Sequence, residues 1–264
     1  MLKFAAILPH PPIIIPTIGS PSDLKKVEKT IKALEKIRED FDKKEIETLF
    51  LISPHGPVSF EAMGMIVEEK LEGNFSMFGD FFTQLSFSND LELCSKIEKS
   101  CQKENIPLSK YKNLSLDHGC LVPLWYLTKN KKPKLVPLAY SLLDRKTHIK
   151  FGKILGKIAK NSPKKIGIVA SGDLSHRLTP SAPAGFSEKG AEFDQKIVSY
   201  LKEGKFEEII KMEEDLVEEA GECGYRSILI LLGALSTLEK VKFEILSYEG
   251  PFGVGYLVAK AVGL

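Results

Sequence analysis

The feature that most constrains this chain is a short apolar run that ends in proline and histidine. Residues 4–8 are apolar and predict a buried strand, and Pro9-His10-Pro11-Pro12 follows immediately. Proline lacks the backbone N–H that a central strand needs to continue its ladder of hydrogen bonds. The strand therefore has to end here, and its carboxyl end has to present His10.

The same pattern recurs twice later in the chain. Residues 49–52 are apolar and lead into Ser53-Pro54-His55, and residues 166–170 lead into a segment that contains Asp173 and His176. In open α/β sheets, ligands bind outside the carboxyl ends of the strands. Three strand ends that each supply a histidine therefore indicate a polar site at one edge of a sheet.

The pattern as a whole predicts one α/β domain over residues 1–264. Helices alternate with the strands and are expected at residues 23–41, 90–103, 144–160 and 227–238. A helix without a polar face is buried, and the last of these has none. We expect a single three-layer α/β/α domain, with a mixed central sheet flanked by helices, because no linker or repeat divides the chain.

Composition excludes several classes of protein. The formal net charge of +2 argues against a nucleic-acid partner. No apolar run approaches the roughly 20 residues of a membrane span, and the start of the chain has no charged region followed by a long apolar segment. The four cysteines show no paired CxxC spacing. We therefore expect a cytoplasmic protein with reduced thiols and no membrane partner.

Two predicted helix starts add polar residues to the expected site. Asp117-His118-Gly119 precedes an apolar run, where the aspartate suits a helix cap. Glu222 and Cys223 lie just before the apolar helix at 227–238, where the helix dipole favours an anion. The fifth histidine, His148, lies among charged residues and is expected to be exposed.

A stretch rich in glycine and phenylalanine, residues 73–82, leaves two interpretations open. Its aromatic side chains either line a pocket or, as is more common for aromatic residues, fill the core. They are Phe75, Phe78, Phe81 and Phe82.

The residue types at the strand ends favour metal chemistry. His10 and His55 supply two neutral imidazoles, which are too few to hold a metal tightly. A carboxylate from Glu222 would complete the two-histidine, one-carboxylate set that non-haem Fe(II) oxygenases use. The candidate metal ligands on this reading are therefore His10, His55 and Glu222.

The other polar residues at the expected edge suit proton transfer. His118 and His176 would remain as proton carriers or substrate contacts, because imidazole titrates near neutral pH. Asp173 lies three residues before His176 and could orient it through a hydrogen bond. These three are the candidate catalytic residues.

In their order and spacing, these motifs resemble the class III extradiol ring-cleavage dioxygenases, the LigB family. The resemblance is closer still to the Memo-like branch, system B of the AmmeMemoRadiSam group. It covers nearly the whole chain, and no single motif carries it. The matching stretches are His10, His55, Asp117-His118-Gly119, residues 171–176 and residues 221–224.

The resemblance implies a function as well as a fold. It implies one mononuclear Fe(II) bound by two histidines and a glutamate, with a small aromatic substrate of the catechol type and O2. His10 and His55 match the two histidine ligands. His176 matches the proton-transferring histidine, and His118 resembles the histidine that helps to position the substrate.

The third ligand is where this chain departs from the dioxygenases. The family glutamate falls at or next to Cys223, and Memo-like proteins have Cys-Gly there, which matches Cys223-Gly224. Either Glu222 binds the metal after a small shift of register, or Cys223 does. We favour Glu222 for an iron site; a thiolate would favour zinc, copper or thiolate-bound iron.

Three functions stay open at this point. The first is opening of catechol-type rings with O2 at Fe(II). The second is a Memo-like metal-binding protein with a redox or partner role, and the third is a zinc hydrolase. The resemblance also allows a homo-oligomer. All three functions require His10, His55, His176 and either Glu222 or Cys223 to converge on one cleft.

Overall fold

The computed structural model describes residues 1–238 and 241–264. Within these residues, one eight-stranded mixed sheet has the strand order β6-β3-β7-β2-β8-β1-β10-β9. Its strands are β1 (Leu2–Leu8), β2 (Thr48–Ser53), β3 (Met63–Ile66), β6 (Leu108–Tyr111), β7 (Lys134–Ala139), β8 (Ile166–Ser171), β9 (Lys242–Glu249) and β10 (Tyr256–Val262). A separate antiparallel hairpin pairs β4 (Lys70–Phe75) with β5 (Asp80–Ser88).

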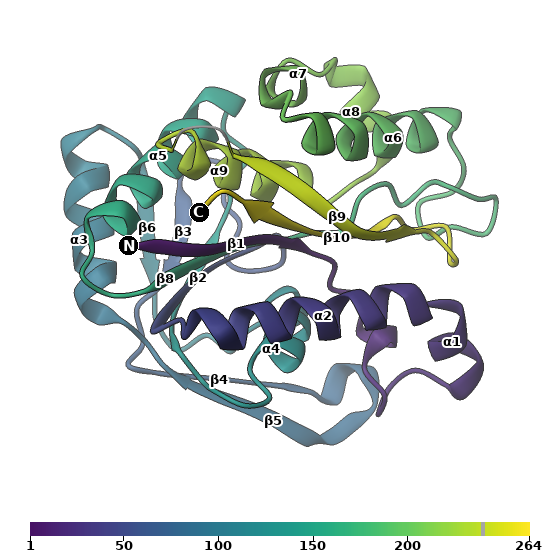
Figure 1. Cartoon of the computed structure of the whole chain (residues 1–264), viewed down its shortest axis with the longest axis horizontal. Helices are drawn as coiled ribbons and strands as arrows, with labels where there is room; N and C mark the ends of the chain where they lie inside the picture. The colour runs from purple at the N-terminus through teal and green to yellow at the C-terminus, as the bar shows by residue number, and fades with distance from the viewer. Residues whose placement is uncertain (239–240) are drawn as a thin grey trace.

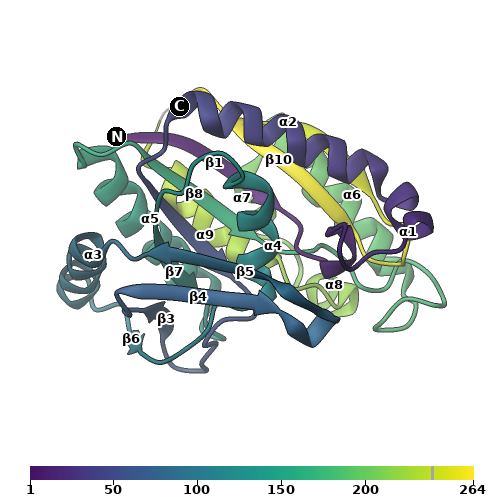
Figure 2. The same cartoon turned by 90° about the horizontal axis from the view of Figure 1, so that it is seen from below.

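Helices cover both faces of the sheet (Figures 1 and 2). α2 (Glu28–Lys44) and α4 (His118–Leu127) pack on one face, together with the β4–β5 hairpin. The other face is covered by α3 (Leu91–Lys103), α5 (Arg145–Asn161), α6 (Glu188–Glu203) and α9 (Tyr225–Leu235). The shorter elements are η1 (Pro12–Ile14), α1 (Pro21–Lys26), η2 (Ser76–Phe78), α7 (Phe206–Ile210) and α8 (Glu214–Ala220). The chain therefore has the predicted α/β fold, with helices on both sides of a mixed sheet.

The four central strands β7, β2, β8 and β1 run parallel to one another. Leu8 pairs with Ser171, and Ser53 pairs with Ala139, so the strands end at nearly the same level. All four are buried almost throughout, as is typical of parallel strands covered on both faces. The segments that follow these strands therefore begin at one shared edge.

The apolar helix α9 sets the position of the segment before it. Every residue of α9 except Arg226 is buried, as the pattern at 227–238 predicts. α5 approaches it very closely, because a Cβ on Gly152 would lie only 2.0 Å from the carbonyl oxygen of Ile230. Such contact needs glycine and leaves little freedom for sliding. The start of α9, with Cys223 just before it, is thereby fixed under the edge of the sheet.

Two sequence predictions about helices are wrong. The helix expected at residues 23–41 is split into α1 and α2, because Val27 leaves the helical region with φ −108° and ψ 21°. Val27 is buried and keeps the apolar spacing, so the pattern conceals the break. His148 is fully buried instead of exposed, and its ring nitrogens lie 2.8 Å and 2.9 Å from the carbonyl oxygens of Asp144 and Ser141. Its charged neighbours in sequence occupy other faces of α5.

One negative finding bears on the expected absence of a membrane partner. In the described part of the chain, no helix combines the length and the apolar character that a membrane span requires. The apolar helix α9 has 11 residues, whereas a span takes about 20. Its apolar surface is used in the core, where it packs on α5 and β8.

Candidate metal centre

Three histidines from three segments meet at the carboxyl edge of the sheet. His10 follows β1, His55 follows β2, and His118 begins α4. The Nε2 atoms of His10 and His55 are 3.0 Å apart. The His118 ring stacks on the His55 ring with centroids 4.3 Å apart, and its centroid is 5.4 Å from that of His10. The structure thus brings these three predicted residues together.

Cys223 joins this histidine group from the far end of the chain. Its Sγ lies 3.6 Å from Nε2 of His10. The donor atoms of His10, His55 and Cys223 all lie within 4.8 Å of one another. We call these three residues, together with His118 and His176, the histidine cluster.

Two glycines allow the cysteine to reach this position. The backbones of Gly172 and Gly224 touch, since a Cβ on Gly172 would lie 2.2 Å from Cα of Gly224. The N–H of Gly224 donates to the carbonyl oxygen of Asp173 at 2.9 Å. In return, the N–H of Asp173 donates to Sγ of Cys223 at 3.3 Å. The Gly172-Asp173 and Cys223-Gly224 segments therefore bind each other, and this contact places Sγ of Cys223 next to His10.

Glu222 precedes Cys223, but its carboxylate is engaged elsewhere. Its Oε2 accepts a hydrogen bond from the backbone N–H of Tyr225, in the first turn of α9. Burial raises the pKa of Glu222 to about 7. Within the described residues, the groups of side chains that could hold a metal include Cys223 and not Glu222. Gly221, at φ +60°, turns the chain just before this point. The geometry therefore favours Cys223 over Glu222 as the third donor.

The hydrogen bonds of Ser171 fix which nitrogen of His10 is free. The Ser171 hydroxyl lies 2.6 Å from the carbonyl oxygen of Gly119, which can only accept, so the hydroxyl donates there. His10 Nδ1 lies 3.0 Å from the same hydroxyl oxygen and therefore has to be the donor in that contact. The lone pair of His10 is left on Nε2, which faces His55 and Cys223. This is the tautomer that a metal ligand needs.

The donor spacing fits a single transition metal ion. Metal–nitrogen bonds of about 2.0–2.1 Å and metal–sulfur bonds of about 2.3 Å place neighbouring ligand atoms roughly 2.9–3.6 Å apart. The observed separations of 3.0 Å between the imidazoles and 3.6 Å from His10 to Cys223 fall in that range. Burial lowers the pKa of both His10 and His55, and metals bind neutral imidazole. The residues present therefore fit a metal.

Asp173 and His176 also lie close to the sulfur of Cys223. The donor atoms of Asp173, His176 and Cys223 form a second group within 4.8 Å. The hydrogen bonds of the described residues do not link the side chains of Asp173 and His176; Oδ1 of Asp173 accepts a hydrogen bond of 3.0 Å from the backbone N–H of His10. Burial raises the pKa of Asp173 to about 7 and lowers that of His176. In the described part of the chain, His176 Nδ1 is buried without a hydrogen-bond partner.

The Asp117-His118-Gly119 motif joins α4 to the end of β2. Asp117 caps α4 by accepting from the backbone N–H of Cys120 at 3.2 Å. It also accepts from the Ser53 hydroxyl at 2.5 Å. Gly119 is required because a Cβ there would lie 2.4 Å from Oγ of Ser53. The motif therefore holds the His118 ring over the strand end, and burial lowers the pKa of that ring.

Three further side chains adjoin the cluster: sequence reasoning missed Ser171 and Tyr140, and it named Phe78 only as one of four aromatic residues that line a pocket or fill the core. Ser171 ends β8 and looks like an ordinary strand residue. The Phe78 ring lies 5.2 Å from the His118 ring, edge to face. Tyr140 follows β7, and its pKa is raised by burial and then by the nearby Glu222 and Cys223. Of Ser171 and Tyr140, only Tyr140 could have been found from the sequence. It directly follows the apolar strand β7, and residues at that position lie at the carboxyl edge of the sheet.

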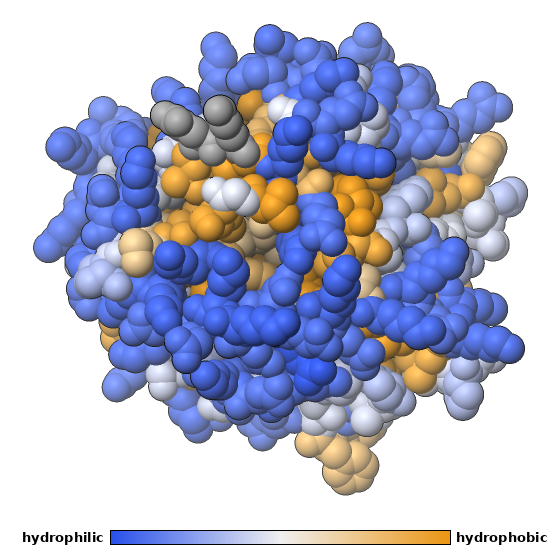
Figure 3. Space-filling model, viewed as in Figure 1, coloured by the Kyte–Doolittle hydropathy of each residue, from blue (hydrophilic) through white to orange (hydrophobic). Residues whose placement is uncertain are grey.

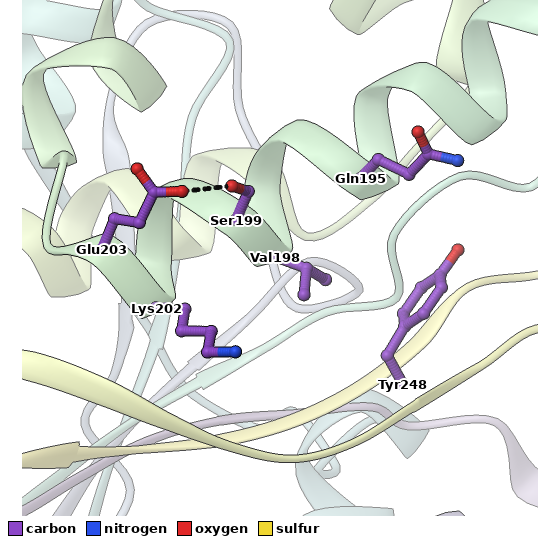
Figure 4. A pocket seen from close by; sticks show the side chains of 6 residues that line it. All are labelled: Gln195, Val198, Ser199, Lys202, Glu203 and Tyr248. Carbon is purple, nitrogen blue, oxygen red and sulfur yellow. Dashed lines mark hydrogen bonds between the residues drawn. The ribbon is translucent and has the colours of Figure 1, made fainter.

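A surface groove lies away from the cluster, between α6 and β9. We call it the α6–β9 groove; its volume is about 610 Å³. On the face of the molecule shown in Figure 3, apolar surface appears between hydrophilic helices. Figure 4 shows the lining side chains, among which Ser199 donates to Glu203 at 2.7 Å. The lining residues are Gln195, Val198, Ser199, Lys202, Glu203 and Tyr248.

Comparison with known proteins agrees with the fold. The family model described as the catalytic LigB subunit of aromatic ring-opening dioxygenase matches residues 4–259. A Clostridium acetobutylicum protein, Protein CA_C1420, is 38% identical over 96% of this chain and 56% of its own length. The 3,4-dihydroxyphenylacetate 2,3-dioxygenase of Escherichia coli is 28% identical over 53% of this chain and 52% of its own length.

Two further matches extend the comparison. A MEMO1 family protein of Methanocaldococcus jannaschii is 26% identical over 60% of this chain and 53% of its own length. The chain thus spans about half the length of these curated relatives. The crystal structure of an uncharacterized Escherichia coli K12 protein, JW3007, matches with a TM-score of 0.70 over 99% of this chain and all of that one, at 17% identity, which shows the fold alone. The match over residues 4–259 shows that this chain belongs to the LigB family, whose relatives include MEMO1 family proteins and extradiol dioxygenases.

Proposed function

We propose that this chain is a metal-dependent oxidoreductase in which His10, His55 and Cys223 hold one transition metal ion. The observation that carries the proposal is the convergence of these three donors at the carboxyl edge of the sheet. The family match over residues 4–259 supports treating residues 1–264 as one catalytic domain. Neither a cofactor-binding loop nor a nucleic-acid partner is part of the proposal.

The proposed substrates are a small aromatic diol of the catechol type and O2. The names of the dioxygenase relatives support this choice, and Fe(II) is the proposed ion. The chemistry that such an ion supplies is Lewis acidity and electron transfer to O2. The outcome is opening of the aromatic ring beside the two substrate oxygens.

The chain's own residues would move protons and hold the substrate. His176 has a buried Nδ1 without a partner in the described structure, and this nitrogen can take the proton of a substrate hydroxyl and return it later. His118 stacks beside the ligand His55 and can position the ring. Burial raises the pKa of the Cys223 thiol, and the N–H of Asp173, which donates to Sγ, offsets only part of this, so binding of a metal would have to release the thiol proton.

A second candidate function is a Memo-like metal-binding protein that does not open rings. Cys223 favours it, because a thiolate in place of a carboxylate suits softer ions such as copper or zinc. Its role would then be redox chemistry or service to a partner protein. The two candidates share the same three ligands and differ in the ion and in turnover.

Metal analysis of anaerobically purified protein tests the site. Cys223→Ala should lose the metal, whereas Glu222→Gln should keep it, because glutamine still offers an oxygen to the N–H of Tyr225. Retention of metal by Cys223→Ala together with loss in Glu222→Gln would refute the ligand set. Absorbance of ring-opened product, after Fe(II)-loaded protein meets catechol and O2, separates the first candidate from the second.

A further inference from the structure

We infer that Phe78, at the tip of the β4–β5 hairpin, is a specificity-determining residue that forms an aromatic wall against which the substrate ring packs. The inference rests on the proposed function, since it assumes an aromatic substrate at the histidine cluster. It assigns to this hairpin a role that the metal ligands and the proton carriers do not cover. The carrying observation is the contact between Phe78 and His118.

The contact places Phe78 at the border of the cluster. Its ring centroid is 5.2 Å from that of His118, with an interplanar angle of 67°. His118 in turn stacks on His55, one of the proposed ligands. Edge-to-face pairs at centroid distances of about 4.5–7 Å are favourable. Phe78 is therefore separated from the proposed ligand His55 by one ring, that of His118.

Phe78 also keeps part of its surface open. It is 36% exposed, whereas Phe75, three residues earlier on the same hairpin, is completely buried. Phe75 therefore anchors the hairpin in the core. Phe78 contacts His118 on one side and has uncovered apolar surface on the other. A planar aromatic ligand at the cluster could cover that surface.

The tip is rigid enough to act as a wall. The carboxylate of Asp80 accepts from the backbone N–H groups of Phe82 and Thr83, at 3.0 Å and 2.9 Å. It also accepts from the Thr17 hydroxyl at 2.5 Å, and Thr17 lies seven residues after His10. Gly79 makes the turn at φ +87°, a conformation that favours glycine. The segment that carries His10 and the tip that carries Phe78 are thus tied to each other.

The same tip supplies a matched control. Phe82 is 97% exposed and lies near the start of β5, beside the same turn. It offers an identical side chain, but its exposure leaves it without a packed contact to the cluster. If any exposed phenylalanine on the hairpin could support substrate binding, Phe78→Ala and Phe82→Ala would weaken binding equally. The inference requires that only Phe78 should matter.

Binding and turnover of catechol and 4-methylcatechol test the inference. Metal-reconstituted wild type, Phe78→Ala, Phe78→Leu and Phe82→Ala are titrated anaerobically by calorimetry and then assayed with O2. Phe78→Ala should weaken binding and raise KM by about 3- to 10-fold, the range expected for a lost aromatic pair, with a smaller change in kcat. Phe78→Leu should recover part of the loss, and Phe82→Ala should match wild type. Metal content should be equal in all four.

The outcomes separate this inference from the function beneath it. If wild type binds and converts catechol but Phe78→Ala does so equally well, the wall is refuted and the proposed function stands. Equal losses in Phe78→Ala and Phe82→Ala would also refute the wall. If wild type neither binds nor converts either catechol, the proposed substrate class fails and the wall fails with it. A thermal unfolding scan of each variant shows whether a loss reflects unfolding.

Discussion

The histidine cluster and the α6–β9 groove differ in where their polar groups find partners. In the cluster, buried groups face one another, as in the chain of contacts from Gly119 through Ser171 to His10. In the groove, Lys202 and Glu203 are exposed and reach water. The groove is a surface cavity of about 610 Å³, whereas the cluster concentrates groups that ionise or bind metals. The chemistry of this chain is therefore expected where ionisable and metal-binding side chains converge, and not in the groove.

The largest effect is expected where the cluster depends on backbone contact. Gly172→Ala would place a Cβ 2.2 Å from Cα of Gly224, so the two backbones have to separate and Cys223 has to move. Overpacking of this kind costs about 1–3 kcal/mol or more, and we expect metal affinity to fall at least about 100-fold with it. Urea unfolding and competition with a chelator measure the two effects.

Gly167→Ala is the control for this change. Gly167 lies on β8, the strand that leads directly into Gly172, and its added Cβ would meet first the tip of the Leu49 side chain, at 3.0 Å. A flexible side chain can give way where a backbone cannot. We expect a smaller loss of stability and unchanged metal binding. Equal metal loss in both variants would show that strand β8 as a whole, and not the glycine contact, positions the sulfur.

One buried carboxylate connects the two regions. Asp194 accepts from the backbone N–H of Ser175, next to His176, and from the hydroxyl of Tyr248, which lines the groove. Burial raises the pKa of Asp194 to about 6 from an ordinary value of 3.8. Between these values the unfolded chain releases the proton while the folded chain keeps it. The stability contributed by this group therefore falls as pH rises through that window and is constant above it.

Asp194→Asn should remove this dependence. Relative to wild type, the free energy of unfolding of the variant should rise by up to about 3 kcal/mol between pH 4 and pH 7, at about 1.4 kcal/mol for each unit of pKa shift. Asparagine keeps an oxygen for the N–H of Ser175, so the fold should survive. Urea titrations of both proteins at several pH values measure the difference. Parallel curves across the window would contradict the raised pKa.

A smaller effect is expected from the hydroxyl that sets the tautomer of His10. Ser171→Ala removes the acceptor for Nδ1, so the imidazole can place its proton on Nε2 instead. Loss of such an outer partner costs about 10- to 100-fold in metal affinity. Ser227→Ala is the control, because the Ser227 hydroxyl is also buried but has no hydrogen-bond partner in the described structure. If both variants bind metal like wild type, Ser171 does not set the tautomer.

The smallest effect is expected in the groove. Gln195→Ala and Lys202→Ala change exposed side chains, and such substitutions alter stability by about 0.5 kcal/mol or less. Metal content and catechol binding should stay as in wild type. Thermal unfolding and metal analysis check both variants. A loss of metal binding in either one would show that the groove and the cluster are coupled, and the contrast between them would have to be withdrawn.

The parts of the fold that the sequence could predict are those set by local rules. Proline after an apolar run ends β1, whatever the rest of the chain does, and an all-apolar segment such as α9 has to be buried. Parallel pairing then places His10 and His55 at one edge. These predictions needed only the backbone chemistry of proline and the pattern of apolar residues.

The remaining features depend on contacts between distant segments. Whether Glu222 or Cys223 faces His10 depends on the turn at Gly221 and on the meeting of Gly172 with Gly224, neither of which leaves a local pattern. Asp173 likewise accepts from the backbone N–H of His10, which follows β1 and is distant in sequence. The sequence suggested His176 as its partner only because the two residues are three positions apart. The burial of His148 depends on packing against the loop after β7.

Two donors of the proposed site are close in space although they are far apart in sequence. His10 and Cys223 are separated by 213 residues, so an unfolded chain rarely brings them together. An ion held by both would bind the folded state almost exclusively and would stabilise it by about 2.7 kcal/mol at a concentration 100 times its dissociation constant. Metal supply would then act on the lifetime of the protein as well as on its chemistry, since metal-starved chains would unfold and be degraded more often.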